Sequence, residues 1–179
     1  MLSPIPNSRV PPSKDTGFLE NLIVQQQAPL LRYATRLLRD PERARDVVQD
    51  TFVKLMAEPR TSIDGHAVEW LFTVCRHRAL DVLRKERRLT SLDPEHDLRA
   101  ISMEPRPGRS LEHAETQEAV LRLIEALPAK QQEVVRLKFQ HGFSYKEVSR
   151  ITGLSVSNVG FLIHTAVARM RGQFASRQP

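Results

Sequence analysis

The sequence contains a single cysteine, Cys75, so no disulfide can form within the chain. The residues around it include Leu71, Phe72 and Val74, and such apolar surroundings favour a buried, unreactive thiol over a reactive one. A reducing compartment is the simplest environment for this composition. We therefore expect the protein in the cytoplasm.

Long apolar runs are also missing. Prolines interrupt the first residues, where a secretion signal would need an unbroken apolar stretch, and no later segment is long enough to span a bilayer. We therefore expect no membrane insertion.

Signals of catalysis and of metal binding are equally scarce. The six histidines are scattered without the spacing of metal ligands, and no glycine-rich phosphate loop is present. No nucleophile is followed by a recognisable base and orienting acid. The sequence therefore predicts a protein that is not an enzyme and has no metal or cofactor.

Positive charge is in excess. The 179 residues include 27 Lys and Arg against 21 Asp and Glu, and the formal charge is +6. This balance favours polyanionic partners such as nucleic acid or an acidic membrane surface, although a merely basic protein has the same composition. With 40% hydrophobic residues, the chain can bury real cores.

The periodicity of apolar residues is helical almost throughout, and no segment shows a strand pattern. We expect an all-α protein in which a flexible Pro-rich extension (1–17) precedes one small helical domain (18–88). A Pro-rich flexible linker (89–112) would join it to a second small helical domain (113–176).

Several local signals place helix ends in the first domain. Pro29 suits the first turn of a helix, so we expect a break or kink near Gln27 to Pro29. Asp40 followed by Pro41 predicts the start of another helix, and the segment 58–67 has the composition of a loop. The apolar stripe of this second helix comprises Ala44, Val47, Val48, Phe52, Leu55 and Met56.

The second domain carries the pattern of a helix-turn-helix. Ser144 is expected to cap a short helix, Gly153 to make the turn, and Ser155 to cap the last helix. In a DNA-binding protein, early residues of the second helix face base edges while nearby cations hold phosphates. A helical hairpin with a purely structural turn is the alternative.

Three stretches, in order, resemble conserved parts of one protein family. They are "LLRYATRLLRDPERARDVVQDTFVKLM", "EWLFTVCRHRALDVLRKERR" and "LPAKQQEVVRLKFQHGFSYKEVSRITGLSVSNVGFLIHTAVARMR". Together they resemble the two conserved domains of the extracytoplasmic-function sigma factors of bacterial RNA polymerase. The resemblance implies an alternative sigma factor that binds core RNA polymerase, directs promoter-specific initiation and melts promoter DNA. It also implies an anti-sigma factor or signalling partner.

The resemblance assigns partners to the first domain. In the family, the helix containing "DVVQDTF" docks on the clamp of the largest polymerase subunit, and the matching residues are Asp46, Gln49 and Asp50. The segment 61–66 and the helix after it are expected to bind the minus-ten element as single-stranded DNA, which requires a polar pocket and nearby cations. The expected minus-ten residues are Ser62, Asp64, Arg76, His77, Arg78, Arg84 and Lys85.

The second domain is expected to bind the minus-thirty-five element as duplex DNA. Family members commonly have a basic or polar stretch where this chain has Gly160, Phe161 and Leu162. Either this face reads DNA, with apolar contact to thymine methyl groups, or part of it packs against protein. We favour DNA reading, and the expected residues are Lys146, Arg150, Ser155, Ser157, Asn158, Phe161, His164, Arg169 and Arg171.

Two other functions stay open on sequence grounds. A conventional helix-turn-helix regulator would bind duplex DNA without polymerase, and it would leave the "DVVQDTF" face unexplained. A helical protein-interaction module would use the apolar recognition helix as an interface.

Overall fold

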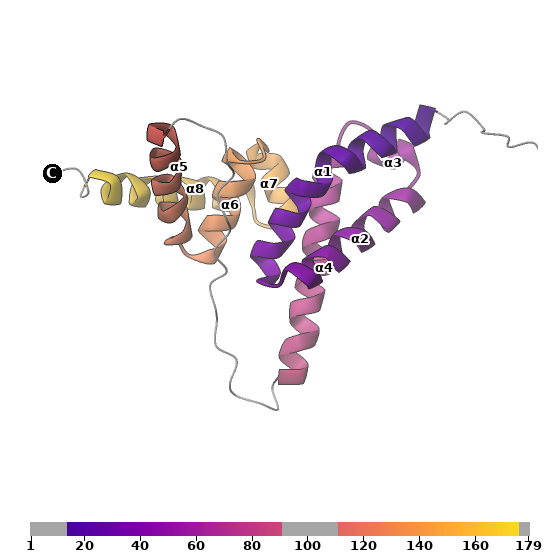
Figure 1. The fold of residues 1–179 in the computed structure, drawn as a ribbon, viewed down its shortest axis with the longest axis horizontal. Helices are drawn as coiled ribbons and strands as arrows, with labels where there is room; N and C mark the ends of the chain where they lie inside the picture. Colours follow the sequence, from indigo (N-terminus) through magenta and orange to yellow (C-terminus); the bar gives the residue numbers. More distant parts are fainter. Residues whose placement is uncertain (1–13, 91–110, 176–179) are drawn as a thin grey trace, which may run out of the picture.

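The protein is described by a computed structural model that covers residues 14–90 and 111–175. Every regular element in these two ranges is an α-helix, so the expected all-α class is confirmed. Helices α1 to α4 form an N-terminal domain, and helices α5 to α8 form a C-terminal domain beside it (Figure 1).

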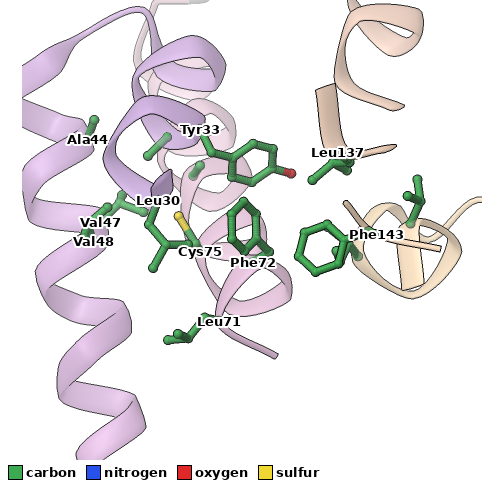
Figure 2. Packing of buried hydrophobic residues seen from close by; sticks show 14 of the residues in the cluster. Leu30, Tyr33, Ala44, Val47, Val48, Leu71, Phe72, Cys75, Leu137 and Phe143 are labelled. Carbon is green, nitrogen blue, oxygen red and sulfur yellow. The ribbon is translucent and has the colours of Figure 1, made fainter. Parts of the chain in front are cut away.

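The N-terminal domain consists of α1 (Lys14–Leu38), α2 (Pro41–Ala57), the short α3 (Arg60–Ile63) and α4 (Ala67–Thr90). The long helices α1, α2 and α4 pack against one another in pairs. Their facing sides bury an apolar core, part of which is drawn in Figure 2, that includes Leu30, Ala34, Val47, Val48, Leu55, Leu71, Phe72 and Cys75. This packing exposes the opposite faces of α2 and α4.

The sequence predicted a break or kink near Gln27 to Pro29. The break is wrong, because helix α1 is continuous through Pro29, and the kink stays a prediction. Proline inside a helix costs about 3 kcal/mol because it removes a backbone hydrogen bond and crowds the preceding turn. Leu30, Tyr33 and Ala34, which follow directly, are all at most 4% exposed. The free energy gained by burying these side chains against α2 and α4 offsets the cost of the proline inside the helix.

The turn between α1 and α2 is tight. The Asp40 carboxylate accepts hydrogen bonds from the backbone N–H groups of Glu42 (2.9 Å) and Arg43 (3.2 Å), so the predicted cap is confirmed. Arg39 adopts φ 56°, a left-handed conformation that L residues rarely take, and this strain had no signal in the sequence. The turn fixes the direction in which α2 leaves α1.

The C-terminal domain consists of α5 (Leu111–Glu125), α6 (Ala129–Phe139), α7 (Tyr145–Thr152) and α8 (Val156–Ala175). Ser144 and Glu147 form a reciprocal capping box at the start of α7, and Gly153 ends that helix with φ 74°. Helices α7 and α8 then meet at 106°, which is the geometry of a helix-turn-helix. The predicted caps and turn are therefore confirmed.

Two expected boundaries differ from the structure. Lys14–Gly17, assigned to the extension, already lie in α1. The expected loop 58–67 contains α3. The remainder of the expected extension (1–13) and most of the expected linker (91–110) lie outside the described residues.

No single helix among the described residues is long and apolar enough to cross a membrane. Helices α7 and α8 together reach the necessary length and composition, but they are the bent pair of the helix-turn-helix.

Candidate nucleic-acid interface

The exposed face of α2 carries both polar and apolar side chains. Asp46, Gln49 and Asp50 all point away from the core, on the side opposite the buried residues of that helix. Val53 and Met56 lie on the exposed part too, at 60% and 61% exposure. Met56 was expected in the buried stripe, and that expectation is wrong: its side chain is exposed, whereas the neighbouring Leu55 is fully buried. An exposed apolar pair beside acidic and amide groups is typical of a protein-binding surface.

Asp50 also contacts a cation of α4. Its Oδ2 lies 3.3 Å from Nη2 of Arg78, and the side chains of Asp50 and Arg78 are 56% and 40% exposed. An exposed ion pair of this kind contributes at most about 1 kcal/mol, so it can exchange for other partners. The pair links a residue expected to bind polymerase with one expected to bind DNA.

The segment before α4 presents small polar groups at the surface. The Ser62 hydroxyl lies 2.7 Å from Oε1 of Glu58 and 2.7 Å from the carbonyl oxygen of Pro59. Asp64 follows α3 as its C-cap, and its carbonyl oxygen lies 3.1 Å from Nδ1 of His66. The expected minus-ten residues Ser62 and Asp64 are thus brought to one exposed corner of the domain.

The expected DNA-binding cations of α4 differ in exposure. His77, Arg84 and Lys85 are exposed, and Nη2 of Arg84 lies 3.2 Å from Oδ1 of Asp81, one helical turn away. Arg76 is largely buried, and its Nε donates a 2.7 Å hydrogen bond to Glu133 of α6. The structure therefore gathers His77, Arg84 and Lys85 at the surface and directs Arg76 toward the C-terminal domain.

The recognition helix α8 presents a mixed polar and aromatic face. The Ser155 hydroxyl oxygen accepts a 3.2 Å hydrogen bond from the backbone N–H of Asn158, which caps the helix as expected. Ser157, Asn158 and His164 are exposed, and the ring of Phe161 is 66% exposed. These side chains lie in the first turns of the helix, where a helix-turn-helix contacts base edges.

The atypical stretch in the middle of α8 divides into three different environments. Leu162 is half-buried and packs against the apolar core, while Gly160 lies against the ring of Tyr145. Phe161 alone points into solvent. Gly160 and Leu162 therefore pack within the protein itself, while Phe161 is exposed; the choice between DNA reading and packing against another protein or the other domain stays a prediction.

Cations flank this face. Lys146, at the start of α7, and Arg169 and Arg171, near the end of α8, are exposed. Arg150 instead donates two hydrogen bonds to the carboxylate of Glu69 in α4, at 2.5 and 2.6 Å. The helix-turn-helix therefore keeps three of the four expected phosphate-binding cations free of the N-terminal domain.

Buried ionisable groups lie away from these surfaces. Cys75 is fully buried, which confirms the expected burial, and this burial raises the pKa of its thiol to about 12. Burial, followed by the charges of Arg36, Arg32 and Arg136, lowers the pKa of His141 to about 4. Within the described ranges, no group of His, Cys, Asp and Glu side chains could hold a metal ion.

The chain thus has two helical domains, and the second contains a helix-turn-helix. The family description "Sigma-70 region 2" matches residues 22–89, and "Sigma-70, region 4" matches residues 117–170. Between them these matches cover most of the chain. A regulator or interaction module with only a helix-turn-helix leaves the first match without explanation.

Known relatives indicate which group of sigma factors the chain is similar to. The chain is 28% identical to the RNA polymerase sigma factor YlaC of Bacillus subtilis over 157 residues, which are 86% of this chain and 90% of the relative. It is 28% identical to the ECF RNA polymerase sigma factor EcfG of Rhodopseudomonas palustris over 156 residues, covering 87% and 84% of the two chains. Its fold is similar to that of the sigma factor RpoE of Bartonella quintana in complex with the anti-sigma factor NepR. That similarity has a TM-score of 0.70 at 22% identity and covers 90% and 99% of the two chains.

The chain belongs to the extracytoplasmic-function sigma factors. It is an alternative sigma factor for transcription initiation by RNA polymerase, and it is not an enzyme.

Proposed function

We propose that three surfaces of this sigma factor divide the work of initiation. The exposed face of α2 binds core RNA polymerase, the corner formed by α3 and α4 captures the single-stranded minus-ten element, and α8 reads the minus-thirty-five duplex. The observation that carries this proposal is the helix-turn-helix face, on which Ser157, Asn158, Phe161 and His164 are exposed together.

On the polymerase-binding surface, charged and apolar side chains contribute to docking in different ways. Asp46 and Asp50 supply negative charge that steers encounter and fixes orientation more than it raises affinity. Val53 and Met56, at about three-fifths exposure, supply apolar area that becomes buried on docking. We include these two residues in the polymerase-binding surface, where the sequence alone indicated only polar ones.

For the minus-ten surface, the proposal requires that an unstacked base find polar partners and that phosphates find cations. Ser62, Asp64 and His77 offer hydrogen-bonding groups, and Arg84 and Lys85 offer positive charge on the same domain. Capturing extruded bases offsets the few kcal/mol that unstacking costs, so melting requires no hydrolysis by this chain.

For the minus-thirty-five surface, Asn158 can form paired hydrogen bonds with adenine, and the Phe161 ring can contact thymine methyl groups. Lys146, Arg169 and Arg171 would hold the phosphates on either side. We also propose that the protein acts in the cytoplasm and has an anti-sigma partner. The partner is supported by the structure of the sigma factor RpoE, which contains the anti-sigma factor NepR.

In vitro transcription tests the proposal. The purified protein is added to sigma-free core polymerase on fragmented genomic DNA, start sites are mapped by sequencing, and core polymerase alone is the control. We expect new start sites that share two upstream sequence elements. An absence of new starts, with no binding to core polymerase in a parallel titration, would contradict the proposal.

A further inference from the structure

A group of cations lies where α1 approaches α6 (Figure 1). The Tyr33 hydroxyl of α1 donates a 2.8 Å hydrogen bond to Glu133 of α6, which fixes the two helices beside each other at this level. One helical turn further along each helix come Arg36 and Arg136. Residues three apart share a face of a helix, so both guanidinium groups are carried toward this contact. Arg32 lies on the same face of α1, one turn before Arg36.

Arg136 is a buried cation without a counter-ion in the described part of the chain. The residue is only 6% exposed, and its Nε has no hydrogen-bond partner among the described residues. Burial lowers the pKa of Arg136, and the charge of Glu125 opposes this in part. A buried charge that is not paired costs free energy, so this position favours a ligand that brings negative charge.

The two arginines of α1 add charge of the same sign. Burial lowers the pKa of Arg36 to about 10, and the charges of Arg136 and Arg32 lower it further. Like charges held close together repel one another, and an anion bound between them would remove that repulsion. Arg32 and Arg36 are partly exposed, so an anion can reach them from the surface.

His141 adds a neutral hydrogen-bonding group. Its backbone N–H donates a 3.2 Å hydrogen bond to the carbonyl oxygen of Arg136, and its Nε2 is buried without a partner among the described residues. Burial, followed by the charges of Arg36, Arg32 and Arg136, lowers the pKa of His141 to about 4. The ring is therefore neutral at about pH 7, and with a proton on Nε2 it can donate a hydrogen bond to an anion.

The four residues Arg32, Arg36, Arg136 and His141 are referred to as the arginine cluster. We propose that the arginine cluster binds a small anion that carries a phosphate group. A guanidinium binds two phosphate oxygens at once, and three guanidinium groups supply enough charge to balance a phosphate dianion. A lone carboxylate carries a single charge and would leave more of the repulsion in place. None of the four residues belongs to the polymerase-binding and promoter-binding surfaces proposed above, so this site is a separate one.

Isothermal titration calorimetry of the full-length protein with inorganic pyrophosphate tests the site. We expect saturable binding by the wild type. Arg36→Gln removes a partly exposed guanidinium and should weaken binding by about 10-fold or more, the effect of losing a charge-assisted contact. Arg122→Gln is the matched control, because this exposed arginine pairs with Glu118 on its own helix. It removes the same charge and should bind pyrophosphate with the affinity of the wild type.

Arg136→Met separates a binding role from a structural one. The variant replaces an unpaired buried charge by an apolar side chain, so without pyrophosphate it should be at least as stable as the wild type in urea denaturation. It should nevertheless bind pyrophosphate about 10-fold or more weakly. A strongly destabilised variant would show that the guanidinium serves the fold, and it would overturn the proposal.

Titration with ATP in place of pyrophosphate identifies the source of the phosphate group, since both present the same chemistry to the arginine cluster. Tighter binding of ATP would indicate a nucleotide, and equal or weaker binding would indicate an inorganic phosphate ion. Either result supports the site, provided that Arg36→Gln weakens the binding. An absence of saturable binding of both compounds, or equal affinities of the wild type, Arg36→Gln and Arg122→Gln, would overturn the proposal.

Discussion

The ring of Tyr145 lies directly against Gly160 of the recognition helix. A Cβ atom placed on Gly160 would sit 3.6 Å from Cε2 of Tyr145, which is ordinary van der Waals contact. The Lys138 ammonium lies 5.5 Å from the centroid of the same ring. The glycine in the middle of α8 thus faces a tyrosine of the scaffold helix, in a position where a long basic side chain would meet that ring.

Gly160→Ala should therefore stabilise the protein. Glycine inside a helix is less favourable than alanine by about 0.8–1.0 kcal/mol, and the new methyl group fits against Tyr145 without displacing it. We expect the free energy of unfolding to rise by up to about 1 kcal/mol in urea denaturation, with unchanged promoter binding. Gly160→Arg is the contrasting variant, because its side chain has to push Tyr145 aside. A destabilised alanine variant would show that the tyrosine contact is tighter than the structure describes.

Asn158→Ala and Phe161→Ala should change which minus-thirty-five sequences are preferred. Both side chains are exposed at the start of α8, where base edges are read, and each lost base contact costs about 1–3 kcal/mol. Binding to a panel of duplexes with single-base changes measures the effect. If every duplex loses affinity equally, neither residue reads a base.

Neutralising the phosphate-binding cations should lower the affinity for DNA without changing which sequences are preferred. Arg169→Gln with Arg171→Gln should weaken binding to all duplexes alike and flatten the dependence of affinity on salt by about two units of slope. Arg122→Gln with Lys130→Gln removes the same charge from exposed positions of the same domain and is the matched control. The measurement is fluorescence anisotropy over a range of salt concentrations. Equal losses from the two pairs would mean that only overall charge matters.

Asp50→Lys should weaken binding to core polymerase without unfolding the protein. The residue is exposed on α2, and its pair with Arg78 is a surface contact whose loss costs at most about 1 kcal/mol. Titration against core polymerase measures the affinity, and circular dichroism checks the helices. Glu20→Lys is the matched control, because it reverses the charge of an exposed residue of α1. This variant should bind core polymerase with the affinity of the wild type. An unchanged affinity for Asp50→Lys would remove α2 from the proposed polymerase-binding surface.

Local features of the fold could be predicted from the sequence because their causes are local. The caps at Asp40 and Ser144 and the turn at Gly153 depend on residues within four positions of one another. The uninterrupted helix through Pro29 was mispredicted because burial of the following residues against two other helices decides it. The helix propensity of a segment depends only on its own residues, so it does not include such packing.

In the candidate site, too, the sequence could predict features with a local cause but not features that depend on contacts between distant residues. Exposure of Asn158 and Phe161 follows from the period of α8 and could be anticipated. The pairing of Arg150 with Glu69 could not, because these residues are separated by 81 positions and no periodicity connects them. The exposure of Met56 was not predicted either, because the apolar pattern of α2 does not show which of its apolar residues the other helices cover.

His141 should make the stability of the protein fall at mildly acidic pH. The centroid of its ring lies 4.7 Å from that of the buried Phe72 ring of α4. Its pKa is lowered to about 4, first by burial and then by the charges of Arg36, Arg32 and Arg136. An unfolded histidine has a pKa near 6.5, so between about pH 6.5 and 4 the unfolded chain binds a proton that the folded chain does not. Stability attributable to His141 is therefore complete above about pH 6.5 and is lost progressively as the pH falls toward 4.

Urea denaturation at pH 7.5 and pH 5.5 measures this loss. At pH 5.5 the contribution should have fallen by about 1 kcal/mol, the free energy of protonating one such histidine in the unfolded chain alone. His141→Phe keeps an aromatic ring beside Phe72 and Phe143 but cannot titrate, so its stability should vary less over the same interval. The other five histidines are common to both proteins and cancel in the comparison. Equal pH dependence in the two proteins would show that His141 is not held neutral by its surroundings.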